Sequence, residues 1–244
     1  MILVSNGCSH TAGAELEYPS QRRCYEKAWP KHLSELLGYE HINLADSGAS
    51  CHRVLRTTMR FILDCLSEKK DMSKYFFIVA WPGMFRTELR RPVDCKDKEY
   101  LLYYDDDWLP LIVGNDDAYK SLFSNRLYAF YKSWIATMDG VKPALDYLHS
   151  ILLLQNFMTL YKIKYRFYNA SPVSIPSYDE LSGYKGLIDK KNFPSFDYVN
   201  QCLTSILYSN NQNISSFSVD SGLSSHYDEE AQKWLANYIY KELQ

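Results

Sequence analysis

The prediction of the fold starts from Met1-Ile-Leu-Val-Ser-Asn-Gly-Cys-Ser-His-Thr-Ala-Gly-Ala14, the segment with which the chain opens. The apolar run from Ile2 to Val4 predicts a buried strand that ends at Asn6-Gly7, where a polar turn begins. In an open parallel sheet, ligands bind beyond the carboxyl ends of the strands. Ser9 in this turn is therefore predicted to lie at the binding edge of the sheet.

The next segments alternate between helix and strand. Pro30 is predicted to begin a helix that stops at Gly38, and residues 41–45 read as a second strand. Ser50 is placed as the N-cap of a second helix. The continuously apolar segment 75–81 is the strongest strand signal and is typical of a strand buried on both faces. This alternation predicts a three-layer α/β/α, flavodoxin-like parallel sheet.

The stretch from about residue 90 to 140 breaks that alternation. It is rich in aromatic residues and predicts a helical, lid-like insertion after the third strand. The acidic run Asp105-Asp-Asp107 is interpreted as a solvated loop, because no ordered set of metal ligands surrounds it.

The remaining elements complete one α/β domain over residues 1–244. We predict a long buried helix from Pro143 to about Tyr161 and a fourth strand at 165–169. A loop at 170–193, a helix at 198–207, a short strand at 214–219 and a closing helix at 228–243 are predicted to follow.

The composition of the chain excludes several classes of partner and function. The chain has 244 residues and a net charge of −2, with dispersed Lys and Arg, which argues against nucleic acid or membrane partners. Six cysteines without CxxC spacing, and a chain that begins directly in a strand, favour a cytoplasmic protein with reduced thiols. No cofactor and no metal are expected. The many aromatic residues suit either a sugar-binding site or an aromatic core.

Three sequence blocks resemble the SGNH (GDSL-type) hydrolase superfamily. They are Asn6-Gly-Cys-Ser-His-Thr-Ala-Gly13, the segment from Trp29 through Asn43-Leu-Ala-Asp-Ser-Gly48, and Ser225-His226 followed by Ala231, Trp234, Leu235 and Ala236. The Gly-Cys-Ser-His-Thr form is similar to variants in phage and bacterial proteins of unknown role. The insertion at 90–140 lies outside this resemblance.

The resemblance implies a serine esterase that acts through an acyl-Ser9 intermediate. Ser9 would be the nucleophile and His226 the general base, because a hydroxyl needs a neighbouring imidazole to remove its proton. The backbone N–H groups of Ser9 and Gly48 would form the oxyanion hole. The expected substrate is a small-molecule or glycan acyl ester, with carbohydrate O-deacetylation as one specific form.

Two departures from the superfamily pattern affect this site. The third block should contain Gly-x-Asn, but the chain reads Ala80-Trp-Pro-Gly-Met84, and Arg86 is the nearest replacement donor. Loss of one oxyanion donor, such as this Asn, costs on the order of a hundredfold in rate. His10, Trp81 and Arg86 are assigned to substrate binding.

The last block should read Asp-x-x-His, yet Leu223 stands three residues before His226. Asp220 is predicted to orient the imidazole through a bulged loop, with a Ser–His dyad oriented by a backbone carbonyl as the alternative.

Each residue also has a simpler interpretation. Ser9 can cap a turn, His226 can precede a helix as a cap, and Arg86 with Glu88 can form a plain ion pair. At the level of function, the rivals are a catalytically inactive SGNH-like protein that binds a carbohydrate or a protein, and an acyltransferase.

Overall fold

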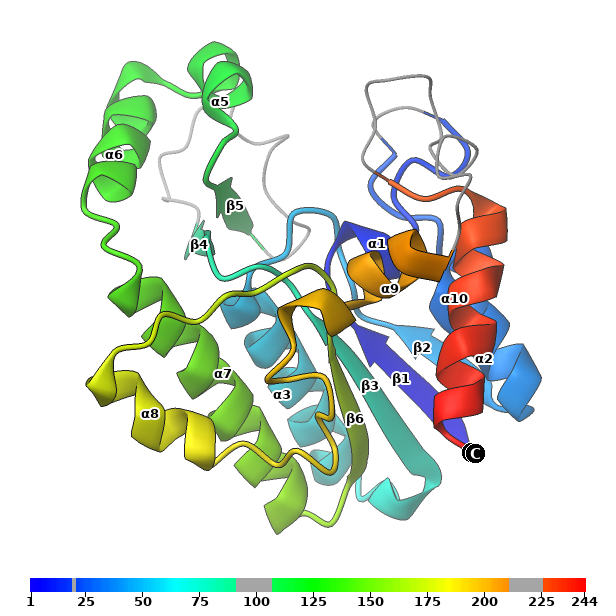
Figure 1. The fold of residues 1–244 in the computed structure, drawn as a ribbon. Helices are drawn as coiled ribbons and strands as arrows, with labels where there is room; N and C mark the ends of the chain where they lie inside the picture. Colours follow the sequence, from blue (N-terminus) through cyan, green and yellow to red (C-terminus); the bar gives the residue numbers. More distant parts are fainter. Residues whose placement is uncertain (19–20, 91–106, 211–225) are drawn as a thin grey trace.

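The computed structural model describes residues 1–18, 21–90, 107–210 and 226–244, and Figure 1 shows their arrangement. A parallel sheet of four strands lies at the centre, in the order β2-β1-β3-β6. The strands are β1 (Ile2–Asn6), β2 (Glu40–Asn43), β3 (Tyr75–Trp81) and β6 (Lys164–Asn169). The predicted parallel α/β fold is confirmed.

Strand register places the carboxyl ends of the strands at one edge. Val4 of β1 lies beside Ile42 of β2 and Phe77 of β3, and Trp81 of β3 lies beside Asn169 of β6. The chain leaves β1 toward β2 on one side and returns to β3 on the other. The loops after β1 and β3 therefore flank the point at which the strand order reverses, where open α/β sheets bind ligands.

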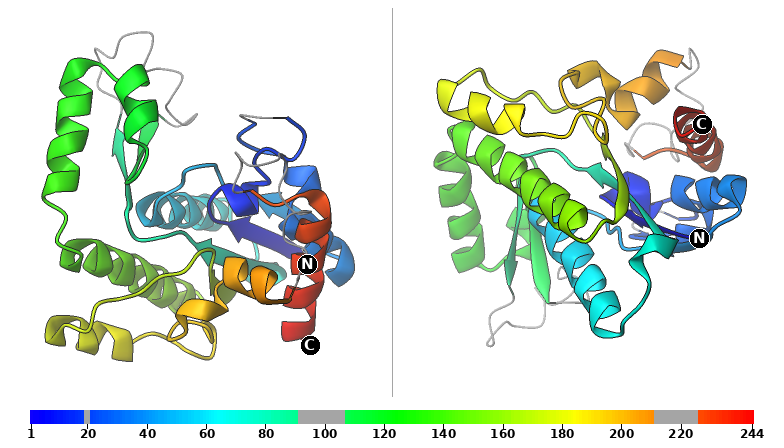
Figure 2. Two further views of the ribbon diagram at one scale, coloured as in Figure 1. Left: turned by 45° about the horizontal axis from the view of Figure 1, so that its top comes forward. Right: turned by 90° about the horizontal axis from the view of Figure 1, so that it is seen from below.

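Helices cover both faces of the sheet. Helices α2 (Trp29–Leu37) and α10 (Glu229–Glu242) pack together, and α3 (Cys51–Ser67) packs on α7 (Val141–Leu160) on the opposite face (Figures 1 and 2). A hydrogen bond joins the first pair, because the Trp29 N–H donates to Gln232 Oε1 over 2.9 Å. The three layers bury a core that includes Leu3, Phe77 and Phe167.

Capping residues end and begin these helices where the sequence indicates. Gly38 ends α2 in the left-handed conformation, with φ +67°. The side chains of Ser50 and Asp228 cap α3 and α10 by accepting hydrogen bonds from the N–H groups of Arg53 and Ala231.

The segment after β3 contains a second, smaller unit. Strands β4 (Arg86–Arg90) and β5 (Trp108–Ile112) pair antiparallel and are followed by α5 (Asp116–Leu122) and α6 (Asn125–Ala136). They share a separate core of Leu109, Leu111, Tyr119, Phe123 and Tyr131. The sequence predicted helix here but not the two strands.

Shorter elements complete the description. They are α1 (Ser9–Ala12), α8 (Asp179–Gly186), α9 (Leu203–Asn210) and the 3-10 helices η1 (Tyr25–Lys27), η2 (Met72–Lys74) and η3 (Val199–Gln201). The predicted loop at 170–193 thus holds α8, and the predicted helix at 198–207 is split into η3 and α9. The strand predicted at 214–219 lies outside the described residues.

Helix α7 is exposed to solvent on one side. It was predicted to be apolar and buried nearly all round, but Leu153 is 51% exposed. Among the described residues, no helix combines the length and the apolar character needed to cross a membrane.

Candidate active site

Ser9 lies at the carboxyl end of β1, as the first residue of α1. The end of the strand is held by the Asn6 side chain. Its Nδ2 donates to the Val54 carbonyl oxygen at 3.1 Å and to the hydroxyls of Thr57 and Thr58, both at 2.8 Å. Three hydrogen bonds to α3 therefore fix the strand end from which Ser9 follows, which gives the hydroxyl a defined position.

Gly7 is required for the tightness of this turn. A Cβ at this position would lie 2.4 Å from Thr11 Oγ1 and 2.9 Å from the Ala80 carbonyl oxygen. Because real Cβ atoms do not approach so closely, the turn accepts only glycine here. The backbone of β1 and that of β3 thus come together immediately before Ser9.

His226 comes to the same edge from the other end of the sequence. Its ring centroid lies 5.4 Å from that of His10, the residue next to Ser9. The segment that carries His226 leads into α10 near α1 (Figure 1). The fold therefore brings the two residues expected to form the catalytic pair, Ser9 and His226, into one neighbourhood.

Glu15 is the acid that contacts the imidazole in the described structure. Its Oε2 lies 2.8 Å from His226 Nδ1. When Nδ1 carries the proton and donates it to this carboxylate, Nε2 keeps its lone pair and can act as a base. Carboxylate and ring are only 27% and 18% exposed, so water weakens the contact less than at an open surface.

Glu15 makes this contact from an unusual backbone conformation. Its φ is +61°, in the left-handed region that side chains rarely enter, and its N–H donates to the Gln21 carbonyl oxygen at 2.9 Å. Strain of this kind costs about 1 to 3 kcal/mol and is found most often at functional sites. Asp220, predicted for the orienting role, lies outside the described residues, and Glu15 was not considered from the sequence.

His10 packs beside this pair as a neutral ring. It stacks on Tyr227, with ring centroids 4.4 Å apart and planes inclined by 23°. Burial, with smaller effects of the neighbouring His226 and Arg86, lowers the pKa of His10 to about 3. His10 is therefore uncharged at neutral pH, and its predicted contact with substrate stays a prediction.

Gly48 supplies the second backbone N–H at this edge. It has φ +76°, and within the described ranges neither its N–H nor that of Ser9 donates a hydrogen bond to another residue. A Cβ on Gly48 would meet Ile112 at 3.4 Å and Pro110 at 3.5 Å, both in β5. The inserted strand pair thus lies directly against the loop that carries Gly48.

A buried carboxylate anchors the Gly48 loop. Asp46 has no exposed side-chain surface and contacts the guanidinium groups of Arg22, Arg23 and Arg53. Its Oδ1 also accepts the Ser47 N–H at 2.8 Å. Because an unpaired buried charge is strongly unfavourable, this cluster holds the loop in one place. No local sequence signal pointed to this role for Asp46.

Arg86 begins β4 and points toward the same loop. Its Nη1 lies 3.4 Å from the Ala49 carbonyl oxygen, one residue beyond Gly48. The alternative that Arg86 pairs with Glu88 is wrong, because Glu88 accepts two hydrogen bonds from Arg56, at 2.9 and 2.8 Å. The Arg56 guanidinium also lies over the Trp108 ring, 4.4 Å from its centroid.

A family of unknown function, DUF6071, matches residues 14–201, which is most of the chain. The chain belongs to this family. The matched range includes Glu15, Gly48 and Arg86 but neither Ser9 nor His226. No curated protein matches the DUF6071 chain.

Several solved structures are similar to the DUF6071 chain. A protein assigned to the G-D-S-L family of lipolytic proteins, from Desulfitobacterium hafniense DCB-2, has a TM-score of 0.47 at 15% identity, and the match covers 98% of each chain. The acetyl xylan esterase AlAXEase has a TM-score of 0.44 at 13% identity, over 100% of both chains. The psychrotrophic esterase EstA from Pseudoalteromonas sp. has a TM-score of 0.43 at 10% identity, over 99% of this chain and 96% of its own.

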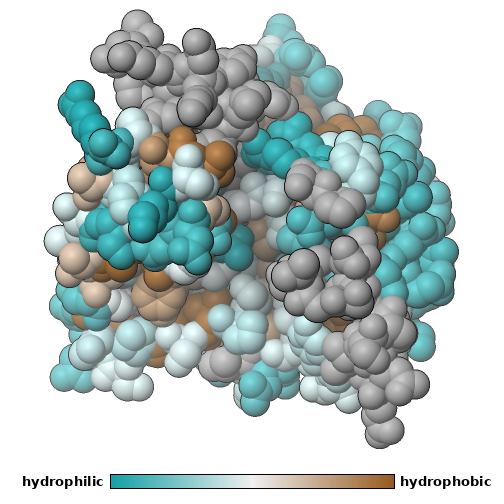
Figure 3. Space-filling model, turned by 90° about the horizontal axis from the view of Figure 1, so that it is seen from above, coloured by the Kyte–Doolittle hydropathy of each residue, from teal (hydrophilic) through white to brown (hydrophobic). Residues whose placement is uncertain are grey.

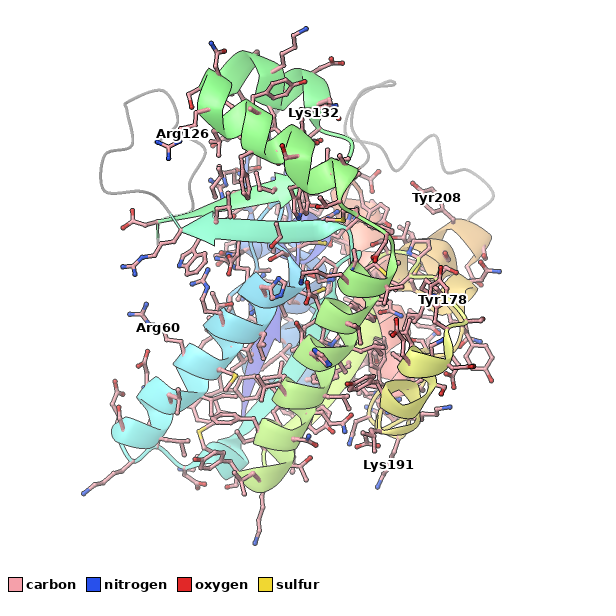
Figure 4. The ribbon with its side chains drawn as sticks, turned by 90° about the vertical axis from the view of Figure 1, so that its left-hand side faces the viewer. Arg60, Arg126, Lys132, Tyr178, Lys191 and Tyr208 are labelled. Carbon is pink, nitrogen blue, oxygen red and sulfur yellow. The ribbon has the colours of Figure 1, made fainter. Side chains whose placement is uncertain are left out.

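The DUF6071 chain also has a cavity of about 590 Å³ beside Arg86. It lies between the first turns of α3 and α7 on one side and β4, β5 and the end of α6 on the other, an arrangement visible in Figure 4. We call this cavity the Arg86 cavity. The space-filling view from above shows hydrophobic residues among hydrophilic ones on this face of the molecule (Figure 3). The apolar wall of the cavity is formed by Leu55, Met84, Trp108, Trp134, Met138 and Pro143.

Trp81, assigned to substrate binding from the sequence, does not line the Arg86 cavity. It is the last residue of β3, is fully buried, and packs edge-on against Phe167 at 5.5 Å between ring centroids. The ring therefore belongs to the core of the DUF6071 fold. Within the described ranges, no group of three or more His, Cys, Asp or Glu side chains is arranged to hold a metal ion.

Proposed function

We propose that this protein is an SGNH-type serine ester hydrolase. Ser9 is the nucleophile, His226 the general base and Glu15 the carboxylate that orients the base. The observation that carries the proposal is the 2.8 Å contact between Glu15 Oε2 and His226 Nδ1. This contact would orient the His226 imidazole as a base at the edge of the sheet where Ser9 lies, although the two residues are far apart in the sequence.

In the first half of the reaction, Ser9 Oγ attacks the carbonyl carbon of the ester while its proton passes to His226 Nε2. The imidazolium formed is stabilised by Glu15. The tetrahedral intermediate places its negative oxygen where the N–H groups of Ser9 and Gly48 are available. His226 then gives its proton to the departing alcohol, which leaves an acyl-Ser9 ester.

In the second half, water attacks the acyl-Ser9 carbonyl carbon and its proton passes to His226 Nε2. The same N–H groups receive the second oxyanion. Collapse of this intermediate returns the proton to Ser9 and releases the carboxylic acid, so the cycle consumes one ester and one water. The side chain of Asn6 is hydrogen-bonded to α3, which holds the start of α1 in place for both halves of the reaction.

The substrate class follows from the site and from the cavity beside it. A small acyl group suits Ser9, which is only 7% exposed. The alcohol part of the ester extends into the Arg86 cavity, whose wall holds two indole rings as well as charged side chains. Ring-shaped polar molecules pack well on such rings, and O-acetylated carbohydrates are the first natural esters to assay.

The test compares wild type with Ser9→Ala and His226→Ala in the hydrolysis of p-nitrophenyl acetate. Intact mass after treatment with a fluorophosphonate probe reports whether a serine adduct forms. We expect activity and adduct to disappear in Ser9→Ala, and activity to fall about a thousandfold or more in His226→Ala.

Cys8→Ser is the matched control, because Cys8 adjoins Ser9 but is buried. It should keep both adduct and activity. Equal activity in wild type, Ser9→Ala and His226→Ala, with no adduct in any of them, would rule out the esterase.

A further inference from the structure

We propose that the Arg86 cavity is a binding site for an organic carboxylate, with Arg86 holding the carboxylate and the apolar wall holding the rest of the ligand. The site is separate from the Ser9–His226 pair, and it would exist whether or not Ser9 is a nucleophile. If the esterase assignment holds, the carboxylate belongs to the part of the substrate that lies in this cavity.

Among the residues that the structure describes, the charges around the cavity leave one cation, Arg86, without an ion pair. Arg56 pairs with Glu88 at 2.9 and 2.8 Å, and Lys142 pairs with Asp146 at 2.7 Å. Arg86 forms no ion pair in the described part of the chain, and its hydrogen bond to the Ala49 carbonyl is long at 3.4 Å. Partly buried guanidinium groups are normally matched by an anion, so the cavity is complementary to one.

His52 lines the same cavity, and one of its ring nitrogens lacks a hydrogen-bond partner among the described residues. Nδ1 of His52, near the start of α3, is buried and makes no hydrogen bond in the described structure. A buried polar atom without a partner is unfavourable, but this nitrogen has no accessible surface, so it would reach a ligand only if the ring turned. Arg86 is therefore the group that meets the carboxylate in the structure as it stands, and the His52 ring also lines the cavity.

The apolar wall sets the nature of the remaining ligand. Two indole rings, two methionines, a leucine and a proline face the space that Arg86 borders. Pockets of this kind bind small molecules through apolar contact and use a few polar groups for orientation. The volume of about 590 Å³ suits one ring-sized carboxylate and exceeds what an inorganic anion would fill.

Arg86 also connects the cavity with the edge of the sheet. Its contact with the Ala49 carbonyl places the guanidinium one residue from Gly48. A ligand anchored on Arg86 therefore lies beside the proposed oxyanion donor. This position fits a substrate whose ester group reaches Ser9 while its carboxylate remains in the cavity.

The experiment measures binding of three probes by isothermal titration calorimetry and by indole fluorescence. Cyclohexanecarboxylate has a ring and a charge, cyclohexylmethanol has the ring alone, and acetate has the charge alone. We expect cyclohexanecarboxylate to bind wild type and Ser9→Ala equally, and at least about tenfold more tightly than either of the other probes. A glucuronate and glucose pair extends the comparison to a sugar ring.

Arg86→Gln should lose about tenfold in affinity for cyclohexanecarboxylate and should no longer prefer it to the alcohol. The matched control is Arg90→Gln, at the exposed end of the same strand, which should bind like wild type. Circular dichroism and thermal melting establish that both variants are folded.

Equal affinity of wild type for cyclohexanecarboxylate and cyclohexylmethanol would overturn the proposal. So would an Arg86→Gln variant that keeps its affinity for the carboxylate but loses turnover of neutral esters, because Arg86 would then serve the oxyanion. Neither result depends on the outcome for Ser9, since binding is measured without turnover.

Discussion

His226 Nδ1 and Glu15 Oε2 lie 2.8 Å apart although 211 positions separate the two residues in the sequence. The contact joins the loop after α1 to the segment before α10. It ties the two sequence ends of the proposed catalytic apparatus together, and it makes Glu15 the first residue to test after Ser9 and His226.

Glu15→Gln should lower kcat for p-nitrophenyl acetate by about a hundredfold to ten-thousandfold, with a smaller effect on KM. The amide carries no charge to stabilise the imidazolium and can favour the wrong tautomer of His226. Steady-state kinetics at several pH values measure the change. Glu17→Gln is the control, because Glu17 is in the same loop but pairs with Lys27 and is 45% exposed. Equal loss in the two variants would contradict an orienting role.

Asp46→Asn should destabilise the fold by about 3 to 5 kcal/mol, because it leaves three guanidinium groups around a neutral amide. Urea denaturation gives the free energy of unfolding. Asp64→Asn offers the comparison, since Asp64 is 66% exposed and its ion pair with Arg60 is long at 3.9 Å. It should change stability by less than about 0.5 kcal/mol. Similar values for the two variants would show that Asp46 is not the anchor of the Gly48 loop.

Gly7→Ala should destabilise the protein by about 1 to 3 kcal/mol or prevent folding, because the new Cβ meets Thr11 Oγ1 and the Ala80 carbonyl oxygen. Gly183→Ala is the matched control, because no atom of the described residues lies within 4 Å of its added Cβ and it is inside α8. There alanine should be neutral or stabilising by up to about 1 kcal/mol. Thermal melting of the two variants is sufficient, and a Gly7→Ala variant as stable as Gly183→Ala would disprove the close approach.

Stability should fall with acid in a way that depends on His10. Its folded-state pKa is lowered from 6.5 to about 3, so the unfolded chain takes up this proton first. The contribution is complete above pH 6.5 and declines as pH falls toward 3, by up to about 1.4 kcal/mol per pH unit. His10→Phe, which keeps a ring against Tyr227, should show a shallower loss between pH 6.5 and 4 in urea titrations. Identical pH dependence of the two proteins would show that His10 is charged in the fold.

Local patterns predicted the main sheet and its helices well. Strand β3 has the predicted bounds, Tyr75–Trp81, because its continuous apolar run favours a buried strand and Pro82-Gly83 ends it. Gly38 and Ser50 ended and began helices as expected, since both act through their own backbone or an N–H three residues away. Such signals depend only on neighbouring residues, and the local structure that they favour is the one found in the folded chain.

Features that depend on distant contacts were not predictable in this way. Strands β4 and β5 were missed because β4 is made mostly of charged and polar residues and β5 contains Pro110, a residue that argues against a strand. Glu15 was missed because its role exists only once His226 has been brought to it. Trp81 was assigned to the site from its place at the carboxyl end of a strand, yet that strand is buried on both faces and the ring lies in the core.

Pro110 and Ile112 of the inserted strand pair lie within van der Waals distance of where a side chain on Gly48 would be. The insertion that forms one side of the Arg86 cavity is thus also in contact with the loop that carries the proposed oxyanion donor. Exchanging this insertion for that of a relative would alter reactivity together with ligand preference, so new specificity in this scaffold calls for redesign of the insertion and the Gly48 loop as one piece.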